Sequence, residues 1–146
     1  MGDSTCVKFA NGKAEKLSTE HKTTIKAEYD RIIKSGGKVI NNRVDGRLNL
    51  QHAIGDLCFK STKNLIFYEQ SVTSYPDTNV LDCISNIDFL VLGCDGVWDC
   101  VDLQKFCEDI DREMRENKER KLSEIISEIF DKIISPIGGG LWGRII

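Results

Sequence analysis

The residues best suited to chemistry are two carboxylates, Asp95 and Asp99, which follow an apolar run over residues 87–94. Glycine stands between them and allows a tight backbone turn. Carboxylates at the end of a buried strand, facing away from the core, can hold a hard cation such as Mg²⁺ or Mn²⁺. The alternative is an ordinary Asp-Gly turn in which Asp99 or Asp102 caps the next helix. Spacing alone leaves both interpretations open.

Two further acidic turns could contribute ligands to the same site. Asp3 follows a glycine ahead of the first predicted strand, and Asp56 follows a glycine at the end of segment 48–54. Each turn taken alone is more typical of chain reversal than of metal binding. The sequence does not show that these turns converge.

The two histidines, His21 and His52, give no clear chemical signal. His21 lies in a predicted loop ahead of a helix without an identifiable partner, which favours a structural or surface role over catalysis. The sequence contains no glycine-rich phosphate loop and no Gly-x-Ser-x-Gly elbow. We therefore predict no catalytic side chain from these patterns.

The elements that would position the carboxylates alternate between strands and helices. Residues 5–9 alternate ahead of a hairpin-type Asn-Gly turn, and residues 87–94 have the length and composition of a strand buried on both faces. The remaining predictions are a helix capped by Thr23 or Thr24 and ended by Gly36-Gly37, a short strand at 38–40, a loop over 61–82, and amphipathic helices with stripes from Leu103 to Met114 and from Leu122 to Ile134. Packing of both stripes onto a sheet is favoured over partner binding, so the pattern predicts an α/β or α+β domain.

Composition narrows the classes of partner. The chain of 146 residues has a formal net charge of −3, and its pI near 5.4 favours neither nucleic acid nor a membrane surface as partner. No segment reaches the length of apolar residues that spans a bilayer. The six cysteines lack the two-residue spacing of a zinc or redox motif, and Cys94 and Cys107 fit core positions. Reduced thiols predict a cytoplasmic or nuclear location. The oligomeric state stays open.

Read together and in order, several stretches resemble the type 2C protein serine/threonine phosphatases, the PPM family. The closest likeness is residues 88–99, which nearly match the family's Asp-x-Phe-Leu-Ile-Leu-Ala-Cys-Asp-Gly-x-Trp-Asp. The other matching stretches are 2–4 with 11–14, 17–22, 36–37 with 42–48, 53–56 with Lys60, and 76–77. The resemblance covers about residues 1–134, and the tail over 135–146 diverges as a glycine-rich segment. Residues 1–134 are thus similar to the C-terminal portion of a PPM-type domain.

The resemblance implies a fold, a cofactor and a set of ligands. The family fold is a four-layer α-β-β-α sandwich, so an α+β fold with part of that sandwich is expected here. The resemblance implies Mg²⁺ or Mn²⁺ as cofactor and a phosphoprotein as substrate. Asp95 is similar to a ligand of the core metal pair, and Asp3 and Asp99 are similar to ligands of a third, weaker metal site.

Departures from the family pattern bear on activity. The family's first half, with its Asp-Gly-His-Gly-Gly turn and phosphate-gripping Arg, has no counterpart here, and segment 138–144 stands where an Asp-Asn-Met motif is expected. Gln51-His52 replaces the usual Ser-Arg, and we expect His52 to fill the site of that Arg. The resemblance predicts metal-dependent hydrolysis of phosphoserine and phosphothreonine, with this chain a fragment inactive by itself. The alternatives are a catalytically dead, pseudophosphatase-like binding module and an artefact of the gene model.

Overall fold

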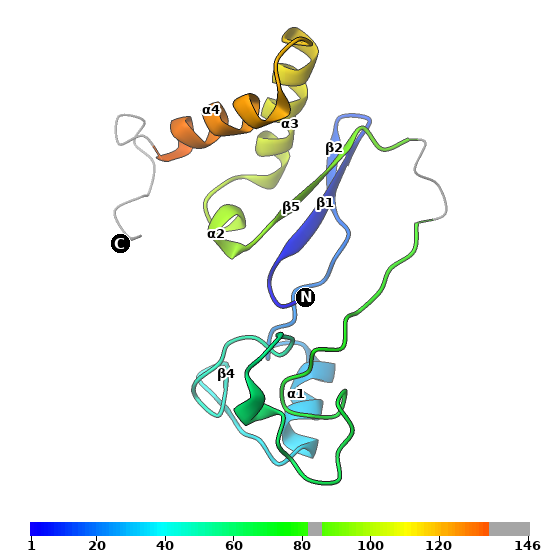
Figure 1. The fold of residues 1–146 in the computed structure, drawn as a ribbon, viewed down its shortest axis with the longest axis vertical. Helices are drawn as coiled ribbons and strands as arrows, with labels where there is room; N and C mark the ends of the chain where they lie inside the picture. Colours follow the sequence, from blue (N-terminus) through cyan, green and yellow to red (C-terminus); the bar gives the residue numbers. More distant parts are fainter. Residues whose placement is uncertain (82–85, 135–146) are drawn as a thin grey trace. The chain divides into compact units, whose positions relative to one another are not determined.

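The computed structural model describes residues 1–81 and 86–134, which belong to two compact units (Figure 1). The first unit comprises Met1–Cys6 and Leu17–Cys83, and the second comprises Val7–Lys16 and Ile84–Ile146. The predicted glycine-rich tail over 135–146 lies outside the described residues. No helix in the described ranges combines the length and apolar character that crossing a bilayer requires.

The sheet of the second unit is built on a hairpin. Strand β1 (Thr5–Ala10) pairs antiparallel with β2 (Lys13–Lys16), with Phe9 opposite Ala14. The turn residues Asn11 and Gly12 have φ values of 52° and 75°, the left-handed conformations that an Asn-Gly hairpin turn requires. The predicted hairpin is therefore confirmed.

Strand β5 (Phe89–Gly93) completes this sheet on the other side of β1, which gives the order β2-β1-β5. The Asp88 backbone N–H donates to the Phe9 carbonyl at 2.9 Å, and the rings of Phe9 and Phe89 stack with centroids 5.0 Å apart. Residues distant in sequence thus meet at the centre of the sheet, where β5 leads into the predicted metal ligands.

Helices α3 (Leu103–Glu116) and α4 (Leu122–Ile134) form the core of the second unit with this sheet. The α3 helix begins at Asp102, whose Oδ1 accepts from the Lys105 backbone N–H at 2.8 Å, so Asp102 is an N-cap. Four side chains from the predicted stripes form one buried cluster: Phe106, Ile110, Ile125 and Ile129. The amphipathic interpretation of both helices is confirmed.

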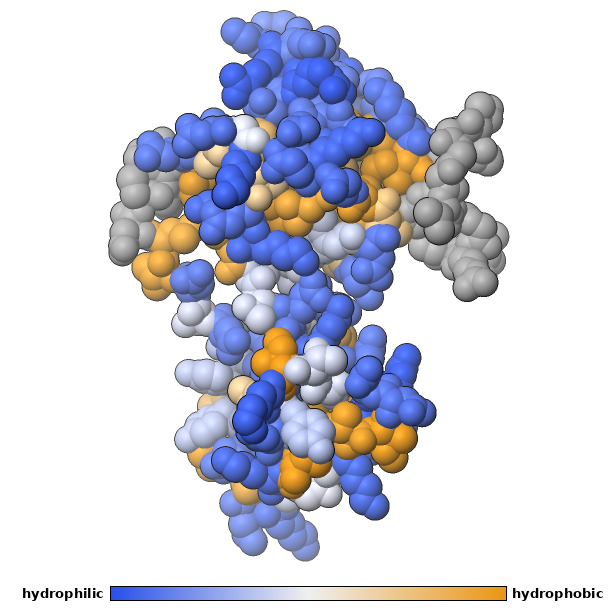
Figure 2. Space-filling model, turned by 180° about the vertical axis from the view of Figure 1, so that it is seen from behind, coloured by the Kyte–Doolittle hydropathy of each residue, from blue (hydrophilic) through white to orange (hydrophobic). Residues whose placement is uncertain are grey.

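The prediction that β5 is buried on both faces is wrong within this chain. Phe89 and Val91 pack against the helix core, but Leu90 and Leu92 keep 48% and 76% of their surface exposed. The cause is that α3 and α4 cover only one side of the strand, and the described residues of the second unit supply no second layer. Hydrophobic surface is accordingly visible on the second unit in Figure 2.

The first unit packs a short helix against irregular chain. Helix α1 (Lys26–Lys34), strands β3 (Val39–Ile40) and β4 (Arg43–Val44) and the 3₁₀ turn η1 (Leu57–Phe59) are its regular elements. The core consists of Ile32, Val44, Phe59 and Val72. No helix or strand occurs over residues 61–81, the described part of the predicted loop.

The predicted start of α1 needs correction, although its end is as expected. The N-cap is Ile25, without a side-chain cap, because the Thr23 hydroxyl instead donates to the Asn42 carbonyl at 2.9 Å. At the other end Gly36 has φ of 86°, the left-handed geometry that commonly follows a helix. The threonine therefore ties two loops together instead of starting the helix.

Candidate metal centre

The Asp95 and Asp99 side chains lie at the two ends of one short helix. A single residue, Cys94, separates the end of β5 from helix α2 (Asp95–Trp98), and Asp99 is the C-cap of this helix. The Asp99 backbone N–H donates to the Asp95 carbonyl at 2.8 Å, so the two residues are one helical turn apart. Both side chains are exposed. The described structure thus presents two carboxylates to solvent directly after the sheet.

Packing of Trp98 fixes this turn against the strand. Its indole Nε1 donates to the Gly93 carbonyl at 2.8 Å, and its ring meets Phe106 edge-on, with centroids 6.1 Å apart. A Cβ atom on Gly93 would come within 3.0 Å of the indole. Any side chain at the end of β5 would therefore crowd the indole ring, which packs directly against the backbone of Gly93.

The turn that carries Asp95 and Asp99 is negatively charged. Burial raises the pKa of the Cys100 thiol, and the negative charges of Asp99 and then Asp95 raise it further. Both carboxylates therefore act on one neighbouring group. Oxygen ligands of this kind fit Mg²⁺ or Mn²⁺. Two carboxylates supply only part of the ligand shell of such an ion.

The third predicted ligand, Asp3, belongs to the first unit, whereas Asp95 and Asp99 belong to the second. Its turn is held by His21, whose backbone N–H donates to the Gly2 carbonyl at 2.8 Å. Asp3 itself is partly buried. The convergence of all three carboxylates on a metal stays a prediction.

At the remaining acidic turn, Asp56 contributes through its backbone conformation and its carbonyl group. Asp56 has φ of 48° and precedes η1, and its carbonyl accepts from the Phe59 backbone N–H at 3.0 Å. Asp56 therefore shapes a turn, which agrees with the structural alternative for this residue.

Sequence reasoning missed a buried polar network in the first unit. Glu28 and Arg31 on α1 form an ion pair of 2.6 Å, and the other Glu28 oxygen lies 3.2 Å from His52 Nε2. Burial alone raises the pKa of Glu28, but hydrogen bonds from His52 and Arg31, with their positive charge, outweigh it and lower the pKa to about 2. These contacts tie His52 to α1, and the expectation that it fills the site of the family's usual Arg stays a prediction. The spacing of Glu28 and Arg31, one helical turn, was the available signal.

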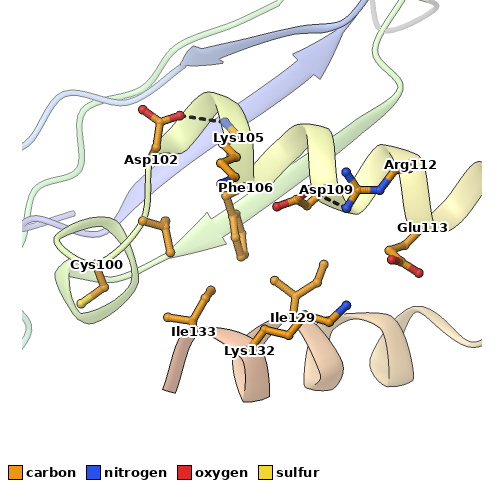
Figure 3. A pocket seen from close by; sticks show the side chains of 11 residues that line it. Cys100, Asp102, Lys105, Phe106, Asp109, Arg112, Glu113, Ile129, Lys132 and Ile133 are labelled. Atoms are coloured by element: carbon orange, nitrogen blue, oxygen red, sulfur yellow. Dashed lines mark hydrogen bonds and ion pairs between the residues drawn. The ribbon is translucent and has the colours of Figure 1, made fainter. Parts of the chain in front are cut away.

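A cleft of about 240 Å³ between α3 and α4 contains none of the predicted ligands. Figure 3 shows Phe106, Ile129 and Ile133 facing this space, with the Asp109–Arg112 ion pair beside them. That pair measures 2.6 Å. Its three carboxylates, Asp102, Asp109 and Glu113, are accompanied by three basic side chains, Lys105, Arg112 and Lys132, and this balance of charge does not favour a hard cation.

Comparison with known proteins defines the class to which this fold and site belong. The sequence profile of the family described as "Protein phosphatase 2C" matches residues 1–137. The chain belongs to the protein phosphatase 2C family. This assignment confirms the resemblance over about residues 1–134, and it makes the chain part of a hydrolase domain by family.

Individual relatives match over nearly the whole chain. Rice "Probable protein phosphatase 2C 11" is 44% identical over 140 residues, which is 94% of this chain and 38% of the rice protein. Human "Protein phosphatase 1G" is 38% identical over 144 residues, 95% of this chain and 26% of the human protein. The chain therefore spans about two fifths or less of the length of these relatives.

A solved structure supports the fold. A phosphatase from Toxoplasma gondii superposes with a TM-score of 0.70 at 30% identity, covering 91% of this chain and 41% of that one. The α+β fold class and the interpretation as part of a phosphatase 2C domain are thereby confirmed. Phosphatases of this family depend on Mg²⁺ or Mn²⁺, and the exposed carboxylate oxygens of Asp95 and Asp99 are of the type that such ions prefer.

Proposed function

We propose that this chain contributes the Asp95 turn to a phosphatase that hydrolyses phosphoserine and phosphothreonine in proteins. The observation that supports this proposal is the pair of exposed carboxylates on α2, in a chain whose family match covers them. Asp95 serves as a ligand of the core metal pair, and Asp99 and Asp3 serve a further metal position. The substrate class is a phosphoprotein.

The chain's own part in the reaction is to hold oxygen ligands in fixed positions. The Asp95 Oδ1 accepts from the Gly96 backbone N–H at 2.7 Å, which orients the carboxylate, and the Trp98–Gly93 hydrogen bond anchors the turn from behind. When bound, Mg²⁺ or Mn²⁺ supplies an activated water and neutralises phosphate oxygens. Preorganised ligands reduce the cost of assembling such a site.

We further propose that the 146 residues alone have no measurable phosphatase activity. Two carboxylates on one turn leave most of the coordination shell to water, so the chain binds a divalent ion weakly. The family resemblance implies that this sequence has no counterpart of the phosphate-binding arginine. It also implies that residues needed to hold a second metal ion are absent from this sequence. Activity therefore requires residues that the chain does not contain.

A chimera tests the proposed function. Residues 1–134 replace the matching segment of human protein phosphatase 1G, which is 38% identical over the matched region, and the host's flanking sequence stays. With Mn²⁺ present, we expect phosphate release from a phosphothreonine peptide. The Asp95→Ala chimera should lose it by at least a hundredfold, since a core ligand is removed.

The control is an Asp131→Asn chimera, because Asp131 is an exposed carboxylate on α4. This chimera should keep the activity of the unmodified one. Equal activity of the Asp95→Ala and unmodified chimeras would disprove the assigned role. A folded chimera without activity would favour the binding-module alternative.

A further inference from the structure

The two histidines of the chain lie together in the first unit, although 30 residues separate them in sequence. Both side chains are about 4% exposed, and their rings stack with centroids 3.6 Å apart at an angle of 15°. The Asp77 carboxylate lies 3.1 Å from His21 Nε2. One nitrogen from each histidine and a carboxylate oxygen of Asp77 lie within 4.8 Å of one another. Three groups that ligate metals thus converge outside the phosphatase ligands.

Each imidazole is oriented by a backbone carbonyl. His21 Nδ1 lies 3.2 Å from the Gly2 carbonyl oxygen, and His52 Nδ1 lies 2.7 Å from that of Tyr75. A carbonyl only accepts, so each Nδ1 carries the hydrogen in these bonds. The Nε2 atoms face carboxylate oxygens, at 3.1 Å from Asp77 in His21 and at 3.2 Å from Glu28 in His52, so a metal ion binds Nε2 with release of the hydrogen that Nε2 donates there. Metal-binding histidines are commonly held in this way, with the second ring nitrogen donating to a carbonyl.

Charge around the cluster favours a cation. Glu28 and Asp77 are carboxylates, and Arg31 Nη1 lies 3.3 Å from His52 Nε2. Arg31 also donates to Glu28 and to the carbonyls of Gln51 and Gln70. Arg31 therefore keeps its partners without His52, and the carboxylates of Glu28 and Asp77 lie within hydrogen-bond distance of the imidazoles.

An ion can reach this cluster from solvent. The Asp77 side chain is 70% exposed, and it lines a cavity of about 460 Å³ together with Glu28, Arg31 and His52. The exposed Asp77 carboxylate and the His52 imidazole, which both line this cavity, provide an entry path for the ion.

We propose that His21, His52 and Asp77 bind a borderline transition-metal ion of the Zn²⁺ type, separately from the Mg²⁺ or Mn²⁺ at Asp95. Imidazole nitrogen suits Zn²⁺, Ni²⁺ and Cu²⁺, whereas Mg²⁺ prefers oxygen. Around tetrahedral Zn²⁺, ligand atoms are about 3.4 Å apart with bonds of about 2.0 to 2.1 Å. The three ligand atoms therefore close around the ion, and the imidazole rings rotate out of their stack.

Histidine-selective NMR measures metal binding at this site directly, because both histidines of the chain belong to the site. The whole chain, labelled with ¹⁵N in histidine, is titrated with ZnCl₂ at pH 7.5. We expect both Nε2 resonances to shift together and to saturate at one equivalent, with both Nδ1 atoms still protonated. MgCl₂ at the same concentration leaves them unchanged. Binding of Zn²⁺ by cysteine thiols does not produce this result.

Two surface variants complete the test. Asp77→Asn removes the carboxylate ligand, and we expect it to weaken Zn²⁺ binding at the histidines at least tenfold. Asp56→Asn is the matched control, because Asp56 is exposed in the same unit and its positive φ suits asparagine. The control should bind Zn²⁺ as the unmodified chain does. Three results would overturn the proposal. The histidine resonances do not change with Zn²⁺, only one ring shifts, or the resonances respond equally in Asp77→Asn and in the unmodified chain.

Discussion

The carboxylate of Glu28 and the guanidinium of Arg31 lie one turn apart on α1 and form an ion pair of 2.6 Å beneath the surface. Glu28 is 7% exposed, so the pair is largely shielded from water. Arg31 extends the contact to the Gln51 and Gln70 carbonyls. Through these bonds α1 holds two segments that lack helix or strand structure, and the first unit depends on a charged network as well as on its small apolar core.

Stability of the first unit should therefore fall in acid. The pKa of Glu28 is lowered from 4.5 to about 2 in the folded chain. A lowered folded pKa stabilises the fold above the unfolded pKa, and this contribution is lost as pH falls from about 4.5 toward 2. At about 1.4 kcal/mol per pKa unit, roughly 3 kcal/mol is at stake. Amide hydrogen exchange at Ile32 between pH 6 and pH 3 measures the loss.

The matched variants are Glu28→Gln and Asp30→Asn, because Asp30 pairs with Lys26 at the exposed side of the same helix. In Glu28→Gln the pH dependence between 4.5 and 2 should be largely absent, and protection should be low at pH 6. Asp30→Asn should behave like the unmodified chain. A Glu28→Gln profile parallel to that of the unmodified chain would refute the role of Glu28.

The contact between Gly93 and Trp98 predicts opposite effects for two glycines. Gly93→Ala places a Cβ within 3.0 Å of the indole, so we expect a loss of about 1 to 3 kcal/mol in the free energy of unfolding. Gly96→Ala meets only the Cys94 sulfur at 3.5 Å, an ordinary contact, and lies within α2. It should be neutral or stabilising by up to about 1 kcal/mol. Urea unfolding followed by circular dichroism compares the two, and equal losses would argue against the close packing.

Cysteine reactivity should separate exposed from buried thiols. Cys58 and Cys94 are exposed, whereas Cys107 is buried, and burial raises the pKa of the Cys107 thiol to about 11. Because the thiolate is the reactive form, iodoacetamide at pH 7.5 should modify Cys107 at least tenfold more slowly than the other two. Peptide mass spectrometry gives the rates, with guanidinium-unfolded chain as the reference. Rapid native labelling of Cys107 would contradict its burial.

The sequence-based interpretation of these cysteines was correct for Cys107 and wrong for Cys94, and the reason is physical. Periodicity shows which residues share a helix face, so Cys107 and Phe106 were predicted to be buried and are. A continuous apolar run gives no such contrast between faces. Cys94 and Leu92 were therefore assigned to a core that the described residues cover on one side only.

The candidate site residues also differ in whether a local sequence pattern could reveal them. Asp95 and Asp99 could be proposed as ligands because their spacing, a glycine and a preceding strand lie within one short segment, and their metal binding stays a prediction. The His21–His52 stack could not, because it forms where segments without regular periodicity meet. Thr23 or Thr24 was predicted to cap α1 from position alone, but the Thr23 hydroxyl has a distant partner at Asn42. Local patterns reveal local contacts, and long-range polar contacts depend on tertiary packing.

The most direct test of metal binding at Asp95 is paramagnetic NMR of the ¹⁵N-labelled chain with Mn²⁺, because the bound ion broadens the signals of nearby amides. We expect selective broadening at Gly96 and Val97, with a dissociation constant of about 1 mM, in the range of weak oxygen-ligand sites. Asp95→Asn should abolish it, and Asp131→Asn, an exposed carboxylate on α4, should not. Two results would contradict a metal-binding role for Asp95. One is identical broadening in Asp95→Asn, and the other is no broadening at Gly96 of the unmodified chain when Mn²⁺ is at ten times that dissociation constant, about 10 mM.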